Sequence, residues 1–507
     1  MLRFKPPHPS LADAAMAGEK LLKLSARAWD AESIRRALLS PFEGEACEFG
    51  YQGLRATDSI AISPLLPLSF IIACDYGLDT AHYDRELRFF SLERGKGVRS
   101  LWTHGALLDS FPEFWGREVK DYLTSRPHPV CLIPYRSTHY MEELSEAEGG
   151  RVKILANPVH LKNVLDDKRR FRAVMGELGL KIPPGYVSLA EDISFREGAR
   201  RLGNPFVAQL PVASSGNGTF LVRDEAELRG LMRRLDYQGD LILNRYIHGY
   251  SLGMTACIYR GQFYMASPSV QLSGIADCSS HIFGYAGSDF AAFSRLVPPA
   301  LKDKLLPQVE RVGEWVAAQG YRGIFGVDFI VEGEELYAIE INPRLLGTTQ
   351  LMTEAQLLSR EVLPSVFLHL AEFLGVEVEV SSREEFNRAT IHAELSGFQL
   401  FLRNTASTAC RVEGEIEPGI YTLEGEGLKF LRFGRFQEEL RDEEEFLLTC
   451  SVVPKGKVVV PGGVFLKLQS RALSAAPNLR DIDERTKTLV KIIRNALEIR
   501  PLEEVPS

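Results

Sequence analysis

Two acidic residues in the segment GVDFIVEGEELYAIEINPR, Asp328 and Glu340, constrain the fold of this chain more than any other feature. The segment predicts two antiparallel strands, VDFIV and LYAIEIN, joined by a tight acidic turn at residues 332–335. Because side chains alternate between the two faces of a strand, Glu340, Asn342 and Arg344 share one face. Pairing the strands about the turn then brings Asp328 opposite the region of Glu340 and Asn342.

The side chains that converge in this hairpin favour a metal ion. Two carboxylates and one carboxamide are hard oxygen donors, and Mg²⁺ prefers such ligands while keeping waters and bridging nucleotide phosphates. A hairpin with acids on a solvated face is the alternative, but it does not explain the Asn-Pro-Arg sequence at 342–344. The hairpin therefore predicts metal ligands at Asp328, Glu340 and Asn342.

This segment resembles the signature hairpin of the ATP-grasp superfamily, in which an acid is followed by a hairpin and then by E-x-N-x-R. Asp328, Glu340, Asn342 and Arg344 match that signature in order and spacing. The resemblance implies that the two acids and the Asn bind Mg²⁺ ions, with Mn²⁺ as an alternative, that hold the phosphates of ATP. It also implies that Arg344 is the catalytic cation, which neutralises the phosphate or acyl phosphate in the transition state.

Length and composition predict a globular protein able to bury real cores. The chain has 507 residues, of which 45% are hydrophobic and 25% charged, and domains of typical size give about three in this length. The net charge is −8 and no basic run stands out, which argues against a nucleic-acid partner.

Targeting features indicate a cytoplasmic protein without a membrane partner. The seven cysteines are dispersed and form no CxxC motif, which fits a reducing compartment better than a disulfide or zinc framework. The first residues, MLRFKPPHPSLADAA, lack the apolar core of a signal peptide. The most apolar stretch, residues 60–74, is interrupted by Pro64 and Pro67 and is too short for a membrane span.

Changes of pattern along the chain divide it into three predicted domains of mixed α/β and α+β class. Residues 1–157 alternate apolar strands with helical patterns, which fits the Rossmann-like preATP-grasp domain that the resemblance implies. Residues 158–375 correspond to a two-lobed ATP-grasp domain. Residues 376–507 are rich in hairpin signals such as VVPKGKVVV and end in an amphipathic helix, so we expect a β-rich C-terminal domain.

Buried parallel strands are predicted in the first domain at residues 68–77, 129–137 and 151–157. No GxGxxG fingerprint follows these strands, so a dinucleotide site is not supported. Loops at the carboxyl ends of parallel strands often bind ligands. The candidate substrate contacts there are Asp75, Tyr76 and Arg136, with helix caps and turns as the alternative.

A glycine-rich loop, SSGNGTF at 214–220, follows the strand predicted at 204–212. Glycines let backbone N–H groups approach phosphate oxygens, and Ser and Thr hydroxyls add donors. A plain hairpin turn is the alternative. By resemblance, the loop is the flap that folds over the triphosphate of ATP. Its candidate nucleotide contacts are Ser214, Ser215, Gly216, Gly218 and Thr219.

The resemblance implies two lysines around the phosphates, and this chain has one of them. Lys168, in a helix predicted over 160–178, falls where the family has a phosphate-binding Lys, although a surface Lys is the alternative. Gln209 stands where the strand before the flap usually ends in a second Lys. Gln contributes no charge, so either Arg245, Arg344 or a second Mg²⁺ compensates, or turnover is slower.

The segment NRYI at 244–247 resembles the hinge of the family, where backbone groups bind the adenine edge. The usual pattern there, E-x-x-I-x-G-x-E, carries two acids, and this chain has Asn244 and Ser251 in their place. The preference for adenine is therefore less secure. The candidate nucleotide contacts are Asn244, Arg245 and Ile247.

Three functions stay open at this point. The first is an ADP-forming carboxylate–amine ligase, similar to short-peptide ligases, which makes an amide or peptide bond through an acyl phosphate. The second is ATP-dependent carboxylation similar to that of biotin carboxylase. The third is nucleotide binding without catalysis, which Gln209, Asn244 and Ser251 favour.

The substrates are small-molecule or peptide carboxylates and amines that no motif identifies, and a homo-oligomer is compatible with the sequence. By resemblance, Thr348, Thr349 and Gln350 are candidates for the acceptor site. His281, in a glycine-bearing loop, is a further candidate contact, with an incidental loop position as the alternative.

Overall fold

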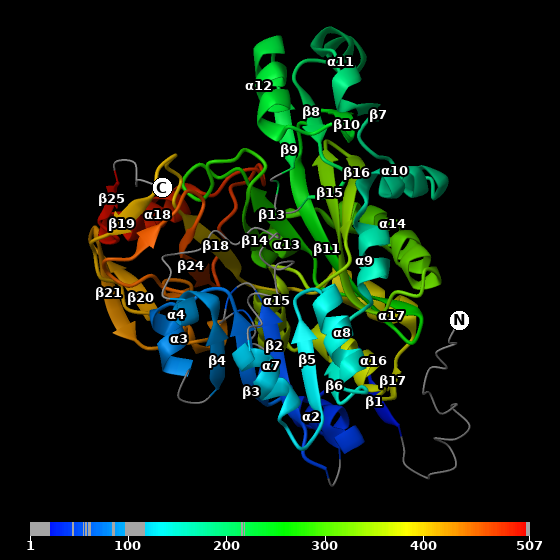
Figure 1. Ribbon diagram of the computed structural model, residues 1–507, viewed down its shortest axis with the longest axis vertical. Coiled ribbons are helices and arrows are strands. Elements are labelled where there is room, and N and C mark those ends of the chain that lie inside the picture. Colours follow the sequence, from blue (N-terminus) through cyan, green and yellow to red (C-terminus); the bar gives the residue numbers. More distant parts are fainter. Residues whose placement is uncertain are drawn as a thin grey trace.

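The structure is a computed structural model that describes residues 21–42, 45–53, 55, 58, 62–83, 87–96, 117–213, 216 and 218–502. Within these residues the strands form five sheets. Figure 1 shows a parallel sheet at the bottom, a small lobe projecting at the top, and a long antiparallel sheet between them that continues toward the C-terminal strands.

The N-terminal part is a five-stranded parallel sheet of order β4-β3-β2-β5-β6. Strands predicted at 68–77, 129–137 and 151–157 are confirmed, whereas two others escaped prediction, since EFGYQG and RFFS lack a long apolar run. The strands are β2 (Glu48–Gly53), β3 (Leu68–Ala73), β4 (Arg88–Ser91), β5 (Val130–Pro134) and β6 (Val152–Ile154). The helices around them are α2 (Ala31–Leu39), η1 (Ser40–Phe42), α3 (Leu78–Tyr83), α4 (Leu92–Lys96), α7 (Arg117–Thr124) and α8 (His139–Ala147).

The projecting lobe is a four-stranded antiparallel sheet of order β7-β10-β8-β9, packed with helices α11 (Phe195–Leu202) and α12 (Glu225–Leu235) (Figure 1). Phe206 and Leu243 lie in its buried core. The strands are β7 (Gly185–Leu189), β8 (Phe206–Gln209), β9 (Thr219–Val222) and β10 (Asp240–Arg245), and a short helix η3 (Ala190–Asp192) follows β7.

The long sheet has eleven strands and holds the predicted acidic hairpin at one edge. Its strands are β11 (Tyr250–Tyr259), β12 (Gln262–Met265), β13 (Ser269–Ser273), β14 (Tyr285–Asp289), β15 (Gly323–Glu332), β16 (Glu335–Asn342), β18 (Phe398–Arg403), β20 (Gly419–Glu424), β21 (Gly427–Arg432), β22 (Phe446–Thr449) and β24 (Val464–Ser470). Residues 241–271, whose alternation favours two strands around a turn at Arg260-Gly261, contribute to four strands instead, because breaks near Gly249 and Pro268 interrupt the alternation.

This sheet joins the second and third predicted domains. Strand β14 pairs with β18, so the hydrogen-bonded ladder crosses the boundary expected near residue 376 without interruption. A shorter parallel pair, β1 (Leu22–Leu24) with β17 (Val378–Val380), ties the N-terminal part to the same region. The remaining sheet contains β19 (Cys410–Val412), β23 (Val458–Val459) and β25 (Ile499–Pro501). The short helix η4 (Gln437–Glu439) contacts α15 (Thr349–Ser359), and α18 (Glu484–Ala496), the predicted closing helix, contacts β21 and buries Leu489 and Ile493.

The helix predicted over 160–178 is broken into α9 (Val159–Asp166) and α10 (Lys168–Glu177). Asp167 adopts an extended backbone, and its side chain accepts a hydrogen bond from the Arg169 N–H, which caps α10. Lys168 therefore lies in the first turn of a new helix. The other helices are α13 (Phe290–Leu296), α14 (Pro299–Ala318), α15 (Thr349–Ser359), α16 (Ser365–Leu374) and α17 (Arg383–Ile391).

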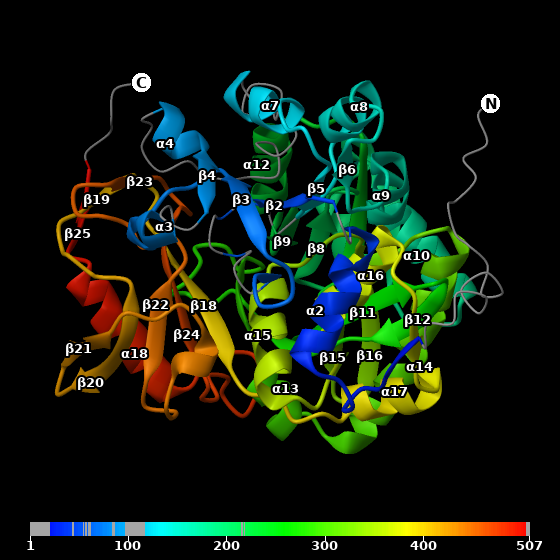
Figure 2. The same ribbon diagram turned by 90° about the horizontal axis from the view of Figure 1, so that it is seen from below.

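Figure 2 shows helices α2 and α16 close to β11, β15 and β16, and α16 contacts β11 and β15 directly. In the described part of the chain, every helix is too short or too polar to cross a membrane. All seven cysteines belong to the described residues, and each is a free thiol.

Candidate active site

The two acids of the hairpin face each other because β16 carries a bulge. Pairing from Glu332 opposite Glu335 to Phe329 opposite Ala338 is regular, and the register shifts immediately after. Ile339 is the extra residue, so Asp328 lies opposite Glu340 rather than opposite Ile339. The predicted meeting of Asp328 with Glu340 is thus observed, and it depends on this irregularity.

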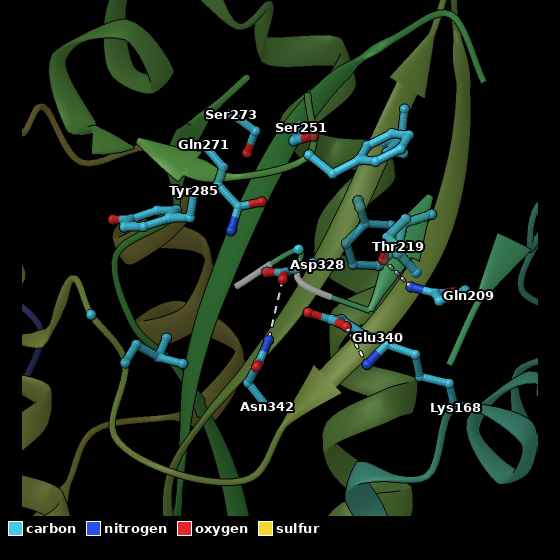
Figure 3. A pocket seen from close by; sticks show the side chains of 18 of the residues that line it. Lys168, Gln209, Thr219, Ser251, Gln271, Ser273, Tyr285, Asp328, Glu340 and Asn342 are labelled. Atoms are coloured by element: carbon cyan, nitrogen blue, oxygen red, sulfur yellow. Dashed lines mark hydrogen bonds and ion pairs between the residues drawn. The ribbon is translucent and has the colours of Figure 1, made fainter. Parts of the chain in front are cut away.

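Asp328 and Glu340 are half-buried side chains on a cavity wall (Figure 3). Burial, and then the negative charge of Glu340, raise the pKa of Asp328 to about 8. The Asn342 amide donates to Asp328 Oδ2 at 3.2 Å. Two carboxylates held together in this way form a site where a cation is electrostatically favoured.

Lys168 connects this acidic pair to the glycine-rich loop. Its ammonium lies 2.8 Å from Glu340 Oε2 and donates to the Ala213 carbonyl at 3.0 Å, while the side chain is only 5% exposed. Burial acts against the charged form, but Glu340 and more distant acids hold the pKa of Lys168 above its ordinary value. The predicted Lys is therefore a buried, charged part of the site and not a surface residue.

Arg344 links the hairpin to the N-terminal sheet. Its guanidinium donates to Asn342 Oδ1 at 2.8 Å and to the Tyr135 hydroxyl at 2.7 Å. Tyr135 follows strand β5, where the sequence indicated Arg136 instead. The carboxyl end of strand β5 therefore does reach the site, but the side chain it contributes is that of Tyr135 and not that of Arg136.

A cavity of about 270 Å³ extends from this hairpin. Eleven of the fourteen predicted site residues line it: Lys168, Gln209, Gly216, Thr219, Asn244, Arg245, Ile247, Asp328, Glu340, Asn342 and Arg344. Ser214 and Ser215 lie outside the described residues. Gly218 does not line the cavity, because it packs against Leu210 and Ala213 instead.

The glycine-rich loop needs a glycine at its cavity-lining position. Gly216 has φ +79°, and a Cβ added there would lie 2.1 Å from the Phe283 carbonyl oxygen. At the base of the loop, Gln209 lies opposite Thr219, and its amide donates to the Thr219 hydroxyl at 3.2 Å. Gln209 thus occupies the place expected for a second Lys and fixes one strand of the loop.

The hinge residues are engaged with neighbouring side chains. The Asn244 side-chain oxygen accepts a hydrogen bond from Arg172 at 2.7 Å. Arg245 donates to Glu332 at 3.1 Å and to the Tyr337 hydroxyl at 2.9 Å. Arg172 also lines the cavity, and burial lowers its pKa. Arg172 was not predicted as a site residue from the sequence, although it follows Lys168 by one helical turn on α10 and therefore lies on the same helix face.

Other cavity-lining residues were also missed. Strand β13 presents Ser269, Gln271 and Ser273, whose spacing of two was a readable signal for one polar face. Figure 3 shows Gln271 and Ser273 at the cavity. Tyr285 lines the cavity on the other side of Asp328 from Lys168 (Figure 3). Further lining residues come from distant segments and had no local signal: Arg55, Tyr135, Ser288 and Arg403.

Several weaker candidates do not line the cavity. Of the three acceptor-site candidates, Thr348 alone lines the cavity. The Thr349 hydroxyl accepts a hydrogen bond from the Leu346 N–H, and the Gln350 side chain is hydrogen-bonded to Glu354 and Lys467 within the protein. His281 accepts a hydrogen bond from the Phe283 N–H in its own loop. Asp75, Tyr76 and Arg136 are likewise absent from the cavity lining, so these substrate-contact predictions are not supported.

Comparison with known proteins identifies the part of the chain that forms this site. A family model described as "ATP-grasp domain" matches residues 165–348, which include Lys168, the glycine-rich loop and the whole hairpin. Residues 165–348 therefore form an ATP-grasp domain. The match ends just after Arg344, so the ATP-grasp domain contains both the acidic pair and the glycine-rich loop.

Curated relatives match this chain over less than half of its length. The formate-dependent phosphoribosylglycinamide formyltransferase of Nitratiruptor sp. is 27% identical over 239 residues, which is 46% of this chain and 58% of that protein. The carbamoyl phosphate synthase large chain of Thermus thermophilus is 26% identical over 214 residues, which is 41% of this chain and 20% of that protein.

Solved structures share the fold over nearly the whole chain. The biotin carboxylase domain of the Hydrogenobacter thermophilus 2-oxoglutarate carboxylase has a TM-score of 0.55 at 16% identity, covering 90% of this chain and 91% of that one. Campylobacter jejuni biotin carboxylase has a TM-score of 0.53 at 15% identity, covering 90% and 92%. The chain therefore shares its overall fold with these structures.

Proposed function

We propose that this protein is an ATP-dependent ligase that joins a carboxylate to an amine through an acyl phosphate and releases ADP and phosphate. The observation that carries the proposal is the pairing of Asp328 with Glu340 across β15 and β16, beside Lys168 and Arg344. Two acids and two cations around one cavity match the needs of phosphoryl transfer, which depends on positioning and on neutralising charge.

The residues present fit a bound Mg²⁺ or Mn²⁺ ion. Asp328 has a raised pKa because its carboxylate is half-buried beside Glu340, and a divalent cation relieves that repulsion. Asn342 now turns its amide nitrogen to Asp328 and its oxygen to Arg344, so an Asn342 ligand requires the amide to rotate. When bound, the ion supplies charge neutralisation between the ATP phosphates. The similar biotin carboxylase domain was solved with MgADP, ADP and bicarbonate, which supports this choice of ligands.

We assign the remaining cavity-lining groups to ATP by their chemistry. Lys168 and the backbone of Gly216 face the phosphates, with the Thr219 hydroxyl as a further donor. Asn244, Arg245 and Ile247 lie on the segment proposed to bind the base. In place of a second Lys, Arg172 adds a cation next to Lys168 on the same helix face.

The chemistry needs two substitutions. An oxygen of the substrate carboxylate attacks the γ-phosphorus of ATP, the bond to ADP breaks, and an acyl phosphate forms. The amine then attacks the acyl carbon, phosphate leaves with the bonding electrons, and the nitrogen loses a proton. Arg344, fixed by Asn342 and Tyr135, stabilises negative charge on the transferred group in both steps. Closure of the loop at 216–219 over the cavity excludes water that would hydrolyse the acyl phosphate.

The same proposal includes domain boundaries at residues 157 and 375. It also includes assembly of the protein as a homo-oligomer. The contact between Arg344 and Tyr135 supports a role for the first domain, because it carries an N-terminal side chain to the reacting groups.

The test is a screen of amino acids, other small carboxylates and short peptides, each with and without an amine, for ADP release by the full chain with Mg²⁺ and ATP. The proposal expects ADP release that requires both partners, and a product whose mass equals their sum less one water. Stimulation by bicarbonate alone would favour carboxylation instead. Tight ATP binding without stimulated ADP release across the panel would favour a non-catalytic nucleotide-binding protein.

A further inference from the structure

Two arginines from distant parts of the chain meet at the end of the cavity that Tyr285 lines. Arg55 follows strand β2 of the N-terminal sheet, and Arg403 ends strand β18 of the long sheet. Both contact the Phe401 ring, with Arg55 Cζ at 4.2 Å and Arg403 Cζ at 5.4 Å from its centroid. Neither arginine belongs to the segment 165–348 that matches the ATP-grasp family model, so the flanking regions supply both cations at this end of the cavity.

Arg403 lacks a compensating negative charge in the described part of the chain. Its recorded hydrogen bond is a long one, 3.5 Å to the Gly462 carbonyl, and no described carboxylate lies within ion-pair distance. Burial, and then the positive charge of Arg55, lower the pKa of Arg403 to about 10. A guanidinium taken out of water beside a like charge is unfavourable unless an anion completes the site.

Arg55 does have a carboxylate partner, but that carboxylate is shared. Its Nε donates to Asp58 Oδ2 at 2.7 Å, and Lys467, a fully buried side chain, lies 3.3 Å from the other Asp58 oxygen. Glu354 is the next acid near Lys467, and burial raises its pKa to about 7. Arg55 and Lys467 thus share Asp58, while Asp75 also acts on Arg55 and Glu354 is partly protonated at neutral pH. Arg403 is the cation of this group for which the described residues supply no ion pair.

The two arginines are separate from the cation that the proposed reaction uses. Arg344 is bonded to Asn342 and Tyr135, next to the acidic pair. Tyr285 and Ser288 line the cavity near Arg55 and Arg403, and their hydroxyls lie 2.9 Å apart. The cavity therefore offers one guanidinium at the acidic hairpin and two more at the Tyr285 end, with neutral hydrogen-bonding hydroxyls beside the second group.

We propose that the carboxylate substrate carries a second anionic group, a carboxylate or a phosphate, that Arg403 and Arg55 bind while the reacting carboxylate faces Arg344. The inference rests on the proposed ligase function. Arginine suits this task because its planar fork binds either anion through two parallel hydrogen bonds. The substrate class is thus a dicarboxylate or a phosphorylated acid rather than a simple monocarboxylate or an uncharged peptide.

The test is calorimetric titration of the full chain, saturated with Mg²⁺ and a non-hydrolysable ATP analogue, with succinate, glutarate, inorganic phosphate, acetate and butyrate. At least one dianion should bind about tenfold tighter than either monoanion, as expected for a charged hydrogen-bond pair. Arg403→Gln should remove that advantage, and Arg403→Lys should keep part of it. Arg295→Gln, an exposed arginine paired with Glu443, is the matched control and should bind the anions like the wild type.

A second readout separates substrate binding from a structural role of Arg403. Without anions, the thermal unfolding temperature of Arg403→Gln should equal or exceed that of the wild type, because an uncompensated charge is removed. A dianion should raise the unfolding temperature of the wild type but not of the variant. A less stable variant that still binds dianions like the wild type would overturn the inference, as would equal affinity of the wild type for all five anions.

Failure of this inference is distinguishable from failure of the proposed function. If the wild type does not bind the nucleotide analogue with Mg²⁺, the ligase proposal itself is wrong. If the analogue binds and ADP is released with monocarboxylates, unaffected by Arg403→Gln, the ligase proposal stands and the dianion assignment is wrong.

Discussion

The ammonium of Lys168 and the carboxylate of Glu340 form a 2.8 Å ion pair in which the Lys side chain is 5% exposed. The same ammonium donates to the Ala213 carbonyl at the base of the glycine-rich loop. One buried cation therefore joins the two elements proposed to hold the ATP phosphates. In the proposed complex, a metal ion on Glu340 takes over the charge that Lys168 now neutralises, and Lys168 becomes available to the phosphates.

Replacing Lys168 tests this connection. Lys168→Met keeps the length of the side chain without its charge, and should weaken binding of Mg²⁺ and ATP by about tenfold or more, the loss expected for a charged hydrogen bond. Calorimetric titration with a non-hydrolysable ATP analogue measures the effect. Lys304→Met, at an exposed Lys paired with Glu334, should leave the affinity unchanged. Equal affinity of the Lys168 and Lys304 variants would contradict the assignment.

Restoring the missing second Lys is a gain-of-function test. Gln209 is 8% exposed, and its amide donates to the Thr219 hydroxyl, a bond that a Lys ammonium can also make. Gln209→Lys should tighten ATP binding about tenfold by adding a cation to the phosphate site. Gln209→Met, which removes the donor without adding charge, should instead weaken it. Weaker binding by Gln209→Lys than by Gln209→Met would show that the residue does not face phosphates.

The pKa of Asp328 predicts an unusual dependence of stability on pH. Its ordinary pKa is 3.8 and its folded-state pKa is about 8. Between these values the unfolded chain binds fewer protons than the folded chain at this position, so its contribution to the free energy of unfolding falls as pH rises. Asp328→Asn should lose this contribution. Denaturant unfolding of both proteins from pH 5 to about 8, without divalent ions, measures the difference.

In the wild type, Mg²⁺ should reduce the same destabilisation at higher pH, because the ion favours the ionised carboxylate. A stability difference between wild type and Asp328→Asn that does not change with pH would contradict the burial of this acid beside Glu340.

His369, which lines a small pocket together with Tyr135 and Arg344, predicts the opposite dependence of stability on pH. Its Nδ1 accepts a hydrogen bond from the Ile324 N–H at 3.1 Å, and burial lowers its pKa from 6.5 to about 4. Between these values the unfolded chain binds more protons, so stability is lost as pH falls through this range. His369→Asn retains an acceptor near the Nδ1 position and should flatten the loss. An unchanged acid limb of the unfolding profile would show that another group controls it.

The sequence predicted which side chains of the hairpin meet, but not how its two strands pair in detail. The turn at 332–335 and the meeting of Asp328 with Glu340 were correct, because strand alternation and turn residues are local signals. The bulge at Ile339 has no such signal, and a regular ladder would have placed Ile339 opposite Asp328. The break at Asp167 was missed for a related reason, since the apolar pattern of α9 and α10 continues across it.

The sequence could not predict which residues outside the ATP-grasp domain line the cavity. Tyr135, Arg55 and Arg403 come from segments far from the ATP-grasp domain, and only tertiary packing places them together. Strand β2 was missed because two glycines interrupt its apolar pattern. By contrast, the polar face of β13, Ser269, Gln271 and Ser273, was readable from its spacing and was passed over.

The central claim is that Asp328 and Glu340 together hold a cation that binds ATP. Its most direct test is titration of the wild type, Asp328→Asn and Glu340→Gln with a non-hydrolysable ATP analogue, each with Mg²⁺ and with excess chelator. The account predicts that the wild type binds the analogue at least about tenfold tighter with Mg²⁺ than without it, and that both folded variants lose this difference. Binding that is independent of Mg²⁺, or equally Mg²⁺-dependent in all three proteins, would contradict it.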